Sequence, residues 1–575
     1  MHQRSCTLPS AHLCVPSRPA FASKPGRVRR IANDTHPTHA RVSSTGFVGG
    51  SASGAGTRRL SAMDVSWKCR AAICTSVTAE TVPEALREIE EAERSGADIV
   101  ELRLDFIKDI KDKPVETVAA LMRKCTKPYI VTFRPVWEGG NYDGDEKLRI
   151  AALKTACVAG APMVDIELKA AKAFFDAEYD VPSTCKVIIS SHDFEKTPSQ
   201  EELDVLVSKI WKAGAQIAKV AAMAKDITDT HKMINLLRNK QGPTIALSMG
   251  ESGQIMRILA PKYGGFLTFG ALGEGRESAP GQPTVRQLRT LYRLPKMTSK
   301  TKVFGVIGDP VSKSRGPLLH NKSMEAVGFD GVYVPLLVKD FNSFFDTFDG
   351  GEISGCSVTM PHKGAALAYA SEVDELTEKI GACNTLVRDD DDGKILKGYN
   401  TDVEAVTAIE AALGPEDSLS GKTFVVIGAG GAAQAIGFAA NSRGAKVLIA
   451  NRTKSKAESL ASSISDTAEA VDWEDLQAGK IAGDVLANTT SLGMQPDVDT
   501  TPVPKAVLGN FSLVFDAVYV PLNTRLLREA DESGCKTVNG VEMFVSQAAE
   551  QFKLFTKQEG PVDLMRKVVL DDLTS

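Results

Sequence analysis

The sequence lacks the features that mark disulfide-rich, zinc-binding and membrane-spanning proteins. Its ten cysteines are scattered, with no Cys-x-x-Cys pair, which argues against a disulfide framework and against a zinc site. No run of about 18 uncharged apolar residues occurs, so no segment is expected to cross a bilayer. Basic residues are not in excess, with Lys+Arg 68 against Asp+Glu 72. We therefore expect no metal, membrane or nucleic-acid partner.

Acidic residues are scarce at the start of the chain. Residues 1–60 hold 9 basic residues and 13 Ser/Thr against one acid, Asp34, which leaves 59 basic and 71 acidic residues, a net charge of −12, in 61–575. An Arg-rich, Ser-rich and acid-poor start is typical of an organelle transit peptide, and we predict one over residues 1–62. The alternatives are a tail with no targeting role, or translation from Met63, which would leave a cytosolic form.

Residues 66–296 contain eight repeats of a strand followed by a helix. Short apolar runs recur and are separated by charged segments of helical period; they lie at 71–77, 98–104, 129–133, 163–168, 186–190, 216–222, 244–248 and 265–270. The segment 81–96 is typical of a helix, with Thr81 as N-cap, Pro83 in the first turn and Gly96 at the end. Eight such units in about 230 residues predict a closed (β/α)8 barrel. An open doubly wound sheet is the lesser alternative.

Charged residues cluster where these strands end, at the rim that carries the active site in such barrels. Glu101, Arg103 and Asp105 recur at every second position, which predicts one face of one strand. Burying three charges is costly, so a site for a polar anion explains them better than a structural ion-pair network, the alternative reading. Arg134 and Glu138 follow the next predicted strand.

Lys219 lies inside an apolar strand, between Ile217, Ala218 and Val220. Desolvation there should favour the uncharged amine, the form that attacks a carbonyl to make a Schiff base. His192 ends the preceding strand and should be its neighbour, poised to remove an activated proton. A snorkelling or ion-paired lysine is the alternative.

These segments resemble the type I 3-dehydroquinate dehydratases over essentially all of 68–295, through ELRLD, TFRPVWEGG, SSHDF, KVAAMA, LSMGESGQIMR and ESAPGQ. The resemblance implies that Lys219 forms the Schiff base and that His192 is the general acid and base, with Glu101 and Glu138 supporting it. It also implies that the substrate's carboxylate and hydroxyls are held by Arg103, Arg134, Arg257, Ser278 and Gln282. Met256 stands where the family has serine, a change that we expect to leave the mechanism intact.

Residues 302–575 again alternate strands and helices, after a linker of several residues around LPKMTSKT. TFVVIGAGGAAQAIGFAA runs from a strand through Gly428, Gly430, Gly431, Ala432 and Ala433 into a helix, a pattern that brings backbone N–H groups to a pyrophosphate. The next strand, KVLIA, is followed by Asn451, Arg452 and Thr453 instead of the acid that an NAD site places there. An arginine without that acid favours a 2′-phosphate, so we predict NADP (NADPH) as cofactor.

GDPVSKSRGPLLHN, SVTMPHK, GACNTL, GYNTD and VFDAVYVPLNTRLL resemble the shikimate dehydrogenase family, over nearly all of 302–556. The resemblance implies a catalytic pair, Lys363 and Asp402, and substrate contacts from Ser312, Ser314, Thr359, Asn384, Tyr519 and Gln547, with Gly540 beside the cofactor. It divides this half into a substrate-binding domain at 302–412, an NADP-binding domain at 413–540, and C-terminal helices at 541–575 that pack back on the substrate domain.

One departure in this half concerns the substrate. The family's Ser-Lys-Ser is Ser314-Arg315-Gly316 here, so one hydroxyl is lost and space is gained. The missing hydrogen bond is worth on the order of 1 kcal/mol. Quinate carries an extra hydroxyl that this space could admit, and we therefore predict detectable quinate oxidation.

The chain as a whole resembles the plant-type bifunctional family that joins these two enzymes. That resemblance implies an α/β fold with small-molecule substrates, a chloroplast stromal location and, as we expect, a monomer. The alternatives are a quinate dehydrogenase with residual dehydratase activity, or a metabolite-sensing regulator without chemistry. The intact Lys219–His192 and Lys363–Asp402 pairs argue against the sensor.

Overall fold

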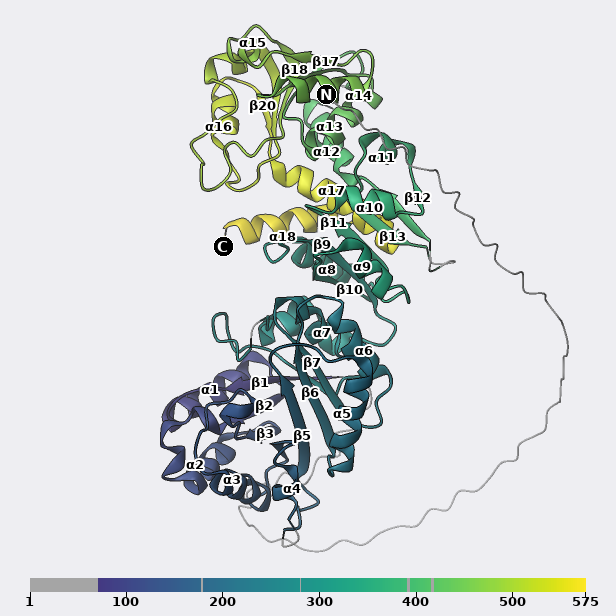
Figure 1. Cartoon of the computed structure of the whole chain (residues 1–575). Helices are drawn as coiled ribbons and strands as arrows, with labels where there is room; N and C mark the ends of the chain where they lie inside the picture. The colour runs from purple at the N-terminus through teal and green to yellow at the C-terminus, as the bar shows by residue number, and fades with distance from the viewer. Residues whose placement is uncertain are drawn as a thin grey trace, which may run out of the picture. The chain divides into compact units, whose positions relative to one another are not determined.

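The computed structural model describes residues 71–176, 179–279, 281–389, 393, 395–414 and 418–574. The predicted transit peptide, residues 1–62, and Met63 lie outside the described residues. Three β-sheets organise the described part, one of eight strands and two of six (Figure 1).

The first sheet is the predicted barrel. Its strands, in the order β7-β6-β5-β4-β3-β2-β1-β8, are β1 Ala72–Val77, β2 Ile99–Arg103, β3 Tyr129–Thr132, β4 Met163–Glu167, β5 Lys186–Asp193, β6 Ile217–Met223, β7 Thr244–Met249 and β8 Leu267–Phe269. Its helices are α1 Val82–Ser95, α2 Pro114–Lys124, α3 Glu146–Val158, α4 Ala171–Phe174, α5 Gln200–Lys212, α6 Asp229–Arg238 and α7 Gln254–Leu259, and a π-helical segment, Gln287–Leu291, follows β8. All ladders are parallel, and the Phe266 backbone N–H donates to Thr244 O at 2.8 Å between β7 and β8.

The sequence explains both layers of the barrel. In α1, the Thr81 hydroxyl accepts a hydrogen bond from Glu84 N, and Gly96 ends the helix at φ 93°, as the capping pattern predicts. On the strands, alternate residues face inward. The inward residues near the strand starts, such as Ile99, Ile130 and Ile217, form an apolar cluster. Farther along these three strands the inward positions include Glu101, Thr132 and Lys219, which puts polar side chains toward the C-terminal rim. The predicted barrel is confirmed.

The second sheet has the order β10-β9-β11-β13-β14-β12, parallel from β10 to β11 and antiparallel through β13. Its strands are β9 Lys302–Gly308, β10 Gly331–Leu337, β11 Gly355–Val358, β12 Glu372–Val373, β13 Thr385–Arg388 and β14 Leu396–Tyr399. The helices along this part of the chain are α8 Gly316–Ala326, α9 Phe341–Thr347, α10 Lys363–Tyr369, α11 Glu375–Ile380 and α12 Ala405–Leu413. The last two helices, α17 Gly540–Thr556 and α18 Val562–Thr574, return to contact β13 and α8 respectively.

The third sheet is fully parallel, in the order β17-β16-β15-β18-β19-β20. Its strands are β15 Thr423–Ile427, β16 Lys446–Ala450, β17 Glu469–Val471, β18 Gly483–Asn488, β19 Phe511–Asp516 and β20 Lys536–Val538, and its helices are α13 Gly431–Ser442, α14 Lys454–Ile464, α15 Trp473–Gln477 and α16 Arg525–Glu532. In chain order this is 3-2-1-4-5-6, the doubly wound order whose reversal point between β15 and β18 forms a nucleotide crevice. The predicted Rossmann-type domain is confirmed.

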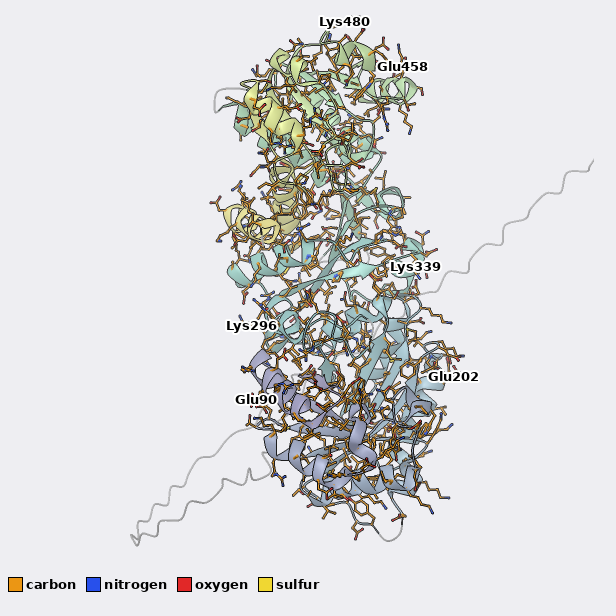
Figure 2. The ribbon with its side chains drawn as sticks, turned by 90° about the vertical axis from the view of Figure 1, so that its left-hand side faces the viewer. Glu90, Glu202, Lys296, Lys339, Glu458 and Lys480 are labelled. Atoms are coloured by element: carbon orange, nitrogen blue, oxygen red, sulfur yellow. The ribbon has the colours of Figure 1, made fainter. Side chains whose placement is uncertain are left out.

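Charged side chains cover the outside of these elements, as Figure 2 shows for Glu90, Glu202, Lys339 and Lys480, all exposed. Among the described residues no helix combines the length and the apolar character that a membrane crossing requires. The same residues contain no group of three or more His, Cys, Asp or Glu side chains arranged to hold a metal ion.

Candidate active sites

The barrel cavity opens at the C-terminal rim of the strands. It brings together all of the residues predicted for this half; the lining includes Glu101, Arg103, Arg134, Glu138, His192, Lys219, Arg257, Ser278 and Gln282. These side chains come from β2, β5 and β6 and from the segments that follow β3, β7 and β8. The topology therefore joins residues that are up to 181 positions apart in the sequence, as strands of one barrel must.

Lys219 and His192 lie on adjacent strands, in the arrangement that the sequence predicts. Lys219 pairs in register with Ser190, and His192 pairs with Ala221, so both groups face the same cavity. Lys219 is 5% exposed, but its surroundings are not purely apolar, which corrects the expectation from desolvation alone. Its Nζ donates to Asp165 Oδ2 at 2.7 Å and lies 3.7 Å from Glu101 Oε1. The amine is thus held by acids in a fixed position.

His192 is arranged as a neutral base. Burial, followed by the charges of Arg134 and Lys219, lowers the pKa of His192 well below 6.5. Glu138 Oε2 accepts from the His192 backbone N–H at 2.8 Å and lies 3.0 Å from the ring Nδ1. A proton on Nδ1 satisfies that contact and leaves Nε2 as the proton acceptor. Burial also raises the pKa of the Glu138 carboxyl, despite the hydrogen bond from His192.

Two acids on β4, Asp165 and Glu167, were not predicted as site residues. Arg134 Nη2 lies 2.9 Å from Asp165, and its Nη1 donates to Glu167 Oε1 at 2.6 Å. Burial alone would raise the pKa of Asp165, but the charges of Arg134 and Lys219 outweigh it and lower that pKa, so Asp165 is a permanent anion. The signal for them was present, because both acids recur at alternate positions in the apolar run 163–168, as Glu101 and Arg103 do on β2.

The charges on β2 form a paired network, which corrects part of the prediction. Asp105 lies beyond the strand, and Arg103 donates to both of its carboxylate oxygens at 2.9 and 2.7 Å. Glu101 accepts from Ser76 and Thr132 at 2.5 and 2.9 Å. The ion-pair network that the sequence left as the lesser alternative is therefore present, although Glu101 and Arg103 still line the cavity.

Arg257 is the exception among the buried cations of the barrel. It is 2% exposed, its Nε has no hydrogen-bond partner, and no acid among the described residues pairs with its guanidinium. Burial lowers the pKa of Arg257 to about 10. A buried guanidinium without a counterion is a ready receptor for a ligand carboxylate. Beside it in the cavity, the Ser278 hydroxyl and the Gln282 side chain hydrogen bond to each other. Met256, where serine was expected, is fully buried in the core and does not line this cavity.

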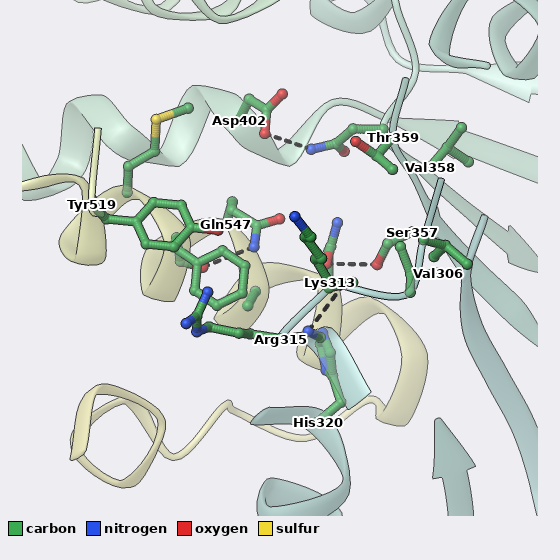
Figure 3. Close-up of a pocket in the computed structure, with 18 of the residues that line it drawn as sticks. Val306, Lys313, Arg315, His320, Ser357, Val358, Thr359, Asp402, Tyr519 and Gln547 are labelled. Carbon is green, nitrogen blue, oxygen red and sulfur yellow. Dashed lines mark hydrogen bonds between the residues drawn. The ribbon is translucent and has the colours of Figure 1, made fainter. Parts of the chain in front are cut away.

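A larger cavity, of about 590 Å³, lies between the second and third sheets (Figure 3). Lys363 begins α10, and its Nζ donates to Asp402 Oδ2 at 2.5 Å. Asn384 Nδ2 donates to the other oxygen of Asp402 at 2.9 Å, which fixes the carboxylate. The aspartate orients the ammonium of Lys363, which can then donate a proton to an oxygen in the cavity.

The remaining residues predicted for the substrate line the same cavity: Ser312, Ser314, Thr359, Tyr519 and Gln547. Ser314 Oγ accepts from Gly316 N at 3.2 Å, and Tyr519 stacks on Phe544 with ring centroids 5.6 Å apart. Tyr333 Oη donates to Ser357 Oγ at 2.7 Å behind Gly316. Hydroxyl groups therefore concentrate around the segment that precedes α8.

The nucleotide-binding residues lie at the reversal point of the third sheet. Gly428 follows β15 at φ 117°, and a Cβ there would lie 2.5 Å from Thr489 Oγ1 at the end of β18, so the turn requires glycine. Gly430 caps α13, and a Cβ on Gly430 or Gly431 would meet no atom within 4 Å, so the helix N-terminus is open to a phosphate. Ala432 and Gly540 line the large cavity, and Ala433 is buried beneath the turn.

Asn451, Arg452 and Thr453 follow β16 as predicted. Asn451 Nδ2 donates to Thr453 O at 3.0 Å, and Arg452 is exposed and forms no ion pair among the described residues. The end of β16 therefore offers a free guanidinium and no acid of its own. This donor set fits the 2′-phosphate of NADP better than the free ribose of NAD.

Together, these two sites define a fused enzyme, with a Schiff-base barrel followed by a nucleotide-dependent dehydrogenase. Family models match both halves: type I 3-dehydroquinase at 73–299, the shikimate dehydrogenase substrate-binding domain at 306–386, shikimate/quinate 5-dehydrogenase at 410–495, and the shikimate 5′-dehydrogenase C-terminal domain at 540–570. The chain belongs to the bifunctional 3-dehydroquinate dehydratase/shikimate dehydrogenase family. It is 46% identical to the chloroplastic member from Arabidopsis thaliana over 86% of this chain and 84% of that protein.

Other similar proteins match the second half or both halves. A shikimate dehydrogenase (NADP+) from Methanosarcina barkeri is 43% identical over 47% of this chain and 99% of its own length. A crystal structure of a shikimate dehydrogenase in complex with NADP+ is 34% identical, with a TM-score of 0.44, over 48% of this chain and 98% of that chain. A dehydroquinate dehydratase and shikimate dehydrogenase structure from S. pombe spans 88% of this chain and 98% of that chain at 24% identity, with a TM-score of 0.42.

Proposed function

We propose that the barrel dehydrates 3-dehydroquinate to 3-dehydroshikimate and that the second half reduces this product to shikimate. The observation that carries the first step is the amine of Lys219 beside the imidazole of His192 in one cavity, with Arg257 left without a counterion. Lys219 attacks the ketone to form an imine and water. His192 Nε2 takes the proton next to the imine carbon and returns it to the departing hydroxyl, and hydrolysis of the imine frees Lys219.

In this mechanism the other charged groups of the barrel bind the substrate or position the reacting side chains, and they do not react themselves. Arg257, with Ser278 and Gln282 beside it, binds the substrate carboxylate. Glu138 keeps His192 in one tautomer, since it accepts from Nδ1. Asp165 fixes the Lys219 side chain and, through Arg134, is tied to Glu167.

The second half performs the reduction with NADPH, held at Gly428–Ala433, Asn451–Thr453 and Gly540. When bound, the cofactor supplies a hydride to the carbonyl carbon. Lys363 donates the proton that the carbonyl oxygen needs, and Asp402, fixed by Asn384, orients Lys363. The substrate ring is positioned by the polar side chains of Ser312, Ser314, Thr359, Tyr519 and Gln547. The chain divides accordingly into domains at 66–296, 302–412 and 413–540, with helices at 541–575.

Two measurements test this function in the full chain. Borohydride with 3-dehydroquinate should add a stable mass to Lys219 in the native protein and none in Lys219→Met. In a coupled assay with 3-dehydroquinate, the native chain should consume NADPH, whereas Lys219→Met should consume it only when supplied with 3-dehydroshikimate. Lys363→Met should show the reverse defect, keeping the adduct and losing NADPH consumption. No adduct and no NADPH consumption in the native chain would support the sensor instead.

Gly316 favours a second substrate, quinate. A Cβ at Gly316 would lie 3.2 Å from Tyr333 Cε1 and 3.3 Å from Ser314 Oγ, so a serine side chain would fill space beside the hydroxyl cluster. We infer that the extra hydroxyl of quinate uses this space. The native chain should reduce NADP+ with quinate, and Gly316→Ser should lower that rate relative to shikimate, with Gly316→Ala separating volume from hydrogen bonding. Activity with shikimate alone, unchanged in Gly316→Ser, would refute this.

We further propose that residues 1–62 direct the protein to the plastid stroma, where it acts as a monomer. The composition of that segment and the chloroplastic relative support the location. Isolated chloroplasts should import and shorten the full-length chain, and import should fail after deletion of 1–62. The mass of the chain beginning at Met63, measured by light scattering, should equal one copy.

A further inference from the structure

One cation in the large cavity has no assigned role. Lys313 lies between β9 and α8, lines the cavity, and points into it between Gln547 and Thr359 (Figure 3). Its side chain is exposed and makes no hydrogen bond or ion pair among the described residues. An unpaired lysine on an outer surface would be unremarkable, but this one is directed into a site that holds a small molecule.

The other charged groups that line this cavity are already neutralised. Lys363 pairs with Asp402 at 2.5 Å, and Arg315 pairs with Asp572 at 2.7 Å. His320 stays uncharged, because burial lowers its pKa to about 3. Among the described residues that line this cavity, Lys313 is therefore the one charged side chain without a counterion, and the cavity as a whole suits an anion.

The position of the substrate carboxylate follows from the position of the reacting carbonyl. Lys363 and Asp402 fix the place of the carbonyl, so a carboxylate elsewhere on the ring must lie away from Asp402. The hydroxyls of Ser314, Ser357 and Tyr333 gather on that side, next to the segment that carries Lys313. Gly316 supplies no side-chain donor there, which leaves the carboxylate short of one partner.

We propose that Lys313 forms an ion pair with the substrate carboxylate and sets the affinity of the dehydrogenase site for anionic ring substrates. This proposal rests on the proposed reduction of 3-dehydroshikimate. A lysine can supply this contact from a flexible stem, as a point charge, without the fixed geometry that a pair of serines requires. Lys313 is thus a specificity-determining residue rather than a proton donor.

The test compares shikimate with its neutral carboxamide in native protein, Lys313→Gln and Lys313→Arg. Lys313→Gln should raise KM for shikimate about five- to tenfold and leave kcat and the KM for NADP+ within twofold. The KM for the carboxamide should move less than twofold, and Lys313→Arg should restore most of the shikimate affinity. Added salt should raise the native KM for shikimate more steeply than that of Lys313→Gln.

Lys322→Gln, at a half-buried lysine on α8 that does not line the cavity, is the control and should behave as native protein. The dehydratase activity of the same chain reports that each variant is folded. Equal losses for shikimate and the carboxamide, or no loss for either, would overturn the role of Lys313. A native protein that oxidises neither compound would instead overturn the proposed function itself.

Discussion

Replacing Arg257 by methionine should make the barrel more stable and its dehydratase weaker. Burial lowers the pKa of Arg257 to about 10, so at neutral pH the folded state keeps this charge out of water, whereas in the unfolded state the same charge is hydrated. Relative to the ordinary pKa of arginine, this lowering corresponds to about 3 kcal/mol of lost charge solvation. Methionine has similar length and no charge, so the free energy of unfolding should rise by up to that amount.

The same change should remove the main contact to the substrate carboxylate. A hydrogen bond to a charged group contributes about 1.5–3 kcal/mol, which predicts a roughly 10- to 150-fold fall in kcat/KM for dehydroquinate. The dehydrogenase activity of the same chain should not change. Dehydroshikimate should raise the melting temperature of the barrel transition in native protein and not in Arg257→Met, whereas the transition of the dehydrogenase half should respond equally in both.

Arg149 provides the control, because it is as deeply buried but fully paired. It lies 2.7 Å from Glu167 and donates to Glu146 and to Phe133 O. Breaking a buried pair costs about 3–5 kcal/mol, so Arg149→Met should destabilise the barrel where Arg257→Met stabilises it. A lower melting temperature for Arg257→Met together with an unchanged kcat/KM would refute the reading of Arg257 as an unpaired receptor.

Three further changes follow from the electrostatics. The neutral form of His192 persists below its ordinary pKa of 6.5, so the acid limb of dehydratase kcat/KM should have its midpoint below pH 6.5, and a midpoint above it would contradict the role of His192. Burial raises the pKa of Asp516 to about 6, so the folded state gains stability from the protonated form and loses it as pH rises through about 6. The free energy of unfolding of the dehydrogenase half, measured in urea, should fall by up to about 3 kcal/mol between pH 4 and 8, and Asp516→Asn should flatten this pH dependence. An equal pH dependence in both proteins would contradict the role of Asp516. Arg452→Asp should lower kcat/KM for NADP+ at least tenfold and leave or improve that for NAD+, whereas equal losses for both would show that Arg452 does not read the 2′-phosphate.

The recurrence of apolar runs along the sequence was enough to predict the strands of the barrel. All eight barrel strands begin within two residues of the predicted apolar runs, because strands buried on both faces are continuous apolar segments bounded by charged helices. The positions of Lys219 and His192 followed, since a strand order fixes which strand ends are neighbours. Where a motif had a clear backbone requirement, as at Gly428, the expected turn is present.

Partners of charged groups were harder to predict, because they depend on contacts between strands. Asp165 lies 54 residues before Lys219 and faces it through the barrel interior, a relation that no local pattern contains. Asp105 likewise fits the alternation of β2, but the chain turns after Arg103 and brings the carboxylate back onto it. Alternation identifies which residues face inward, and three-dimensional packing decides which of them neutralise each other.

The parallel register of β5 and β6 has a consequence for how this barrel can change over evolution. Because Ser190 pairs with Lys219 and His192 with Ala221, a shift of one residue in either strand would turn one reactive group out of the cavity while leaving the other inside. Insertions and deletions should therefore be tolerated in the loops that follow these strands and be rare within β5 and β6. The register between β5 and β6 thus preserves the reaction, whereas the loops can vary and change the substrate.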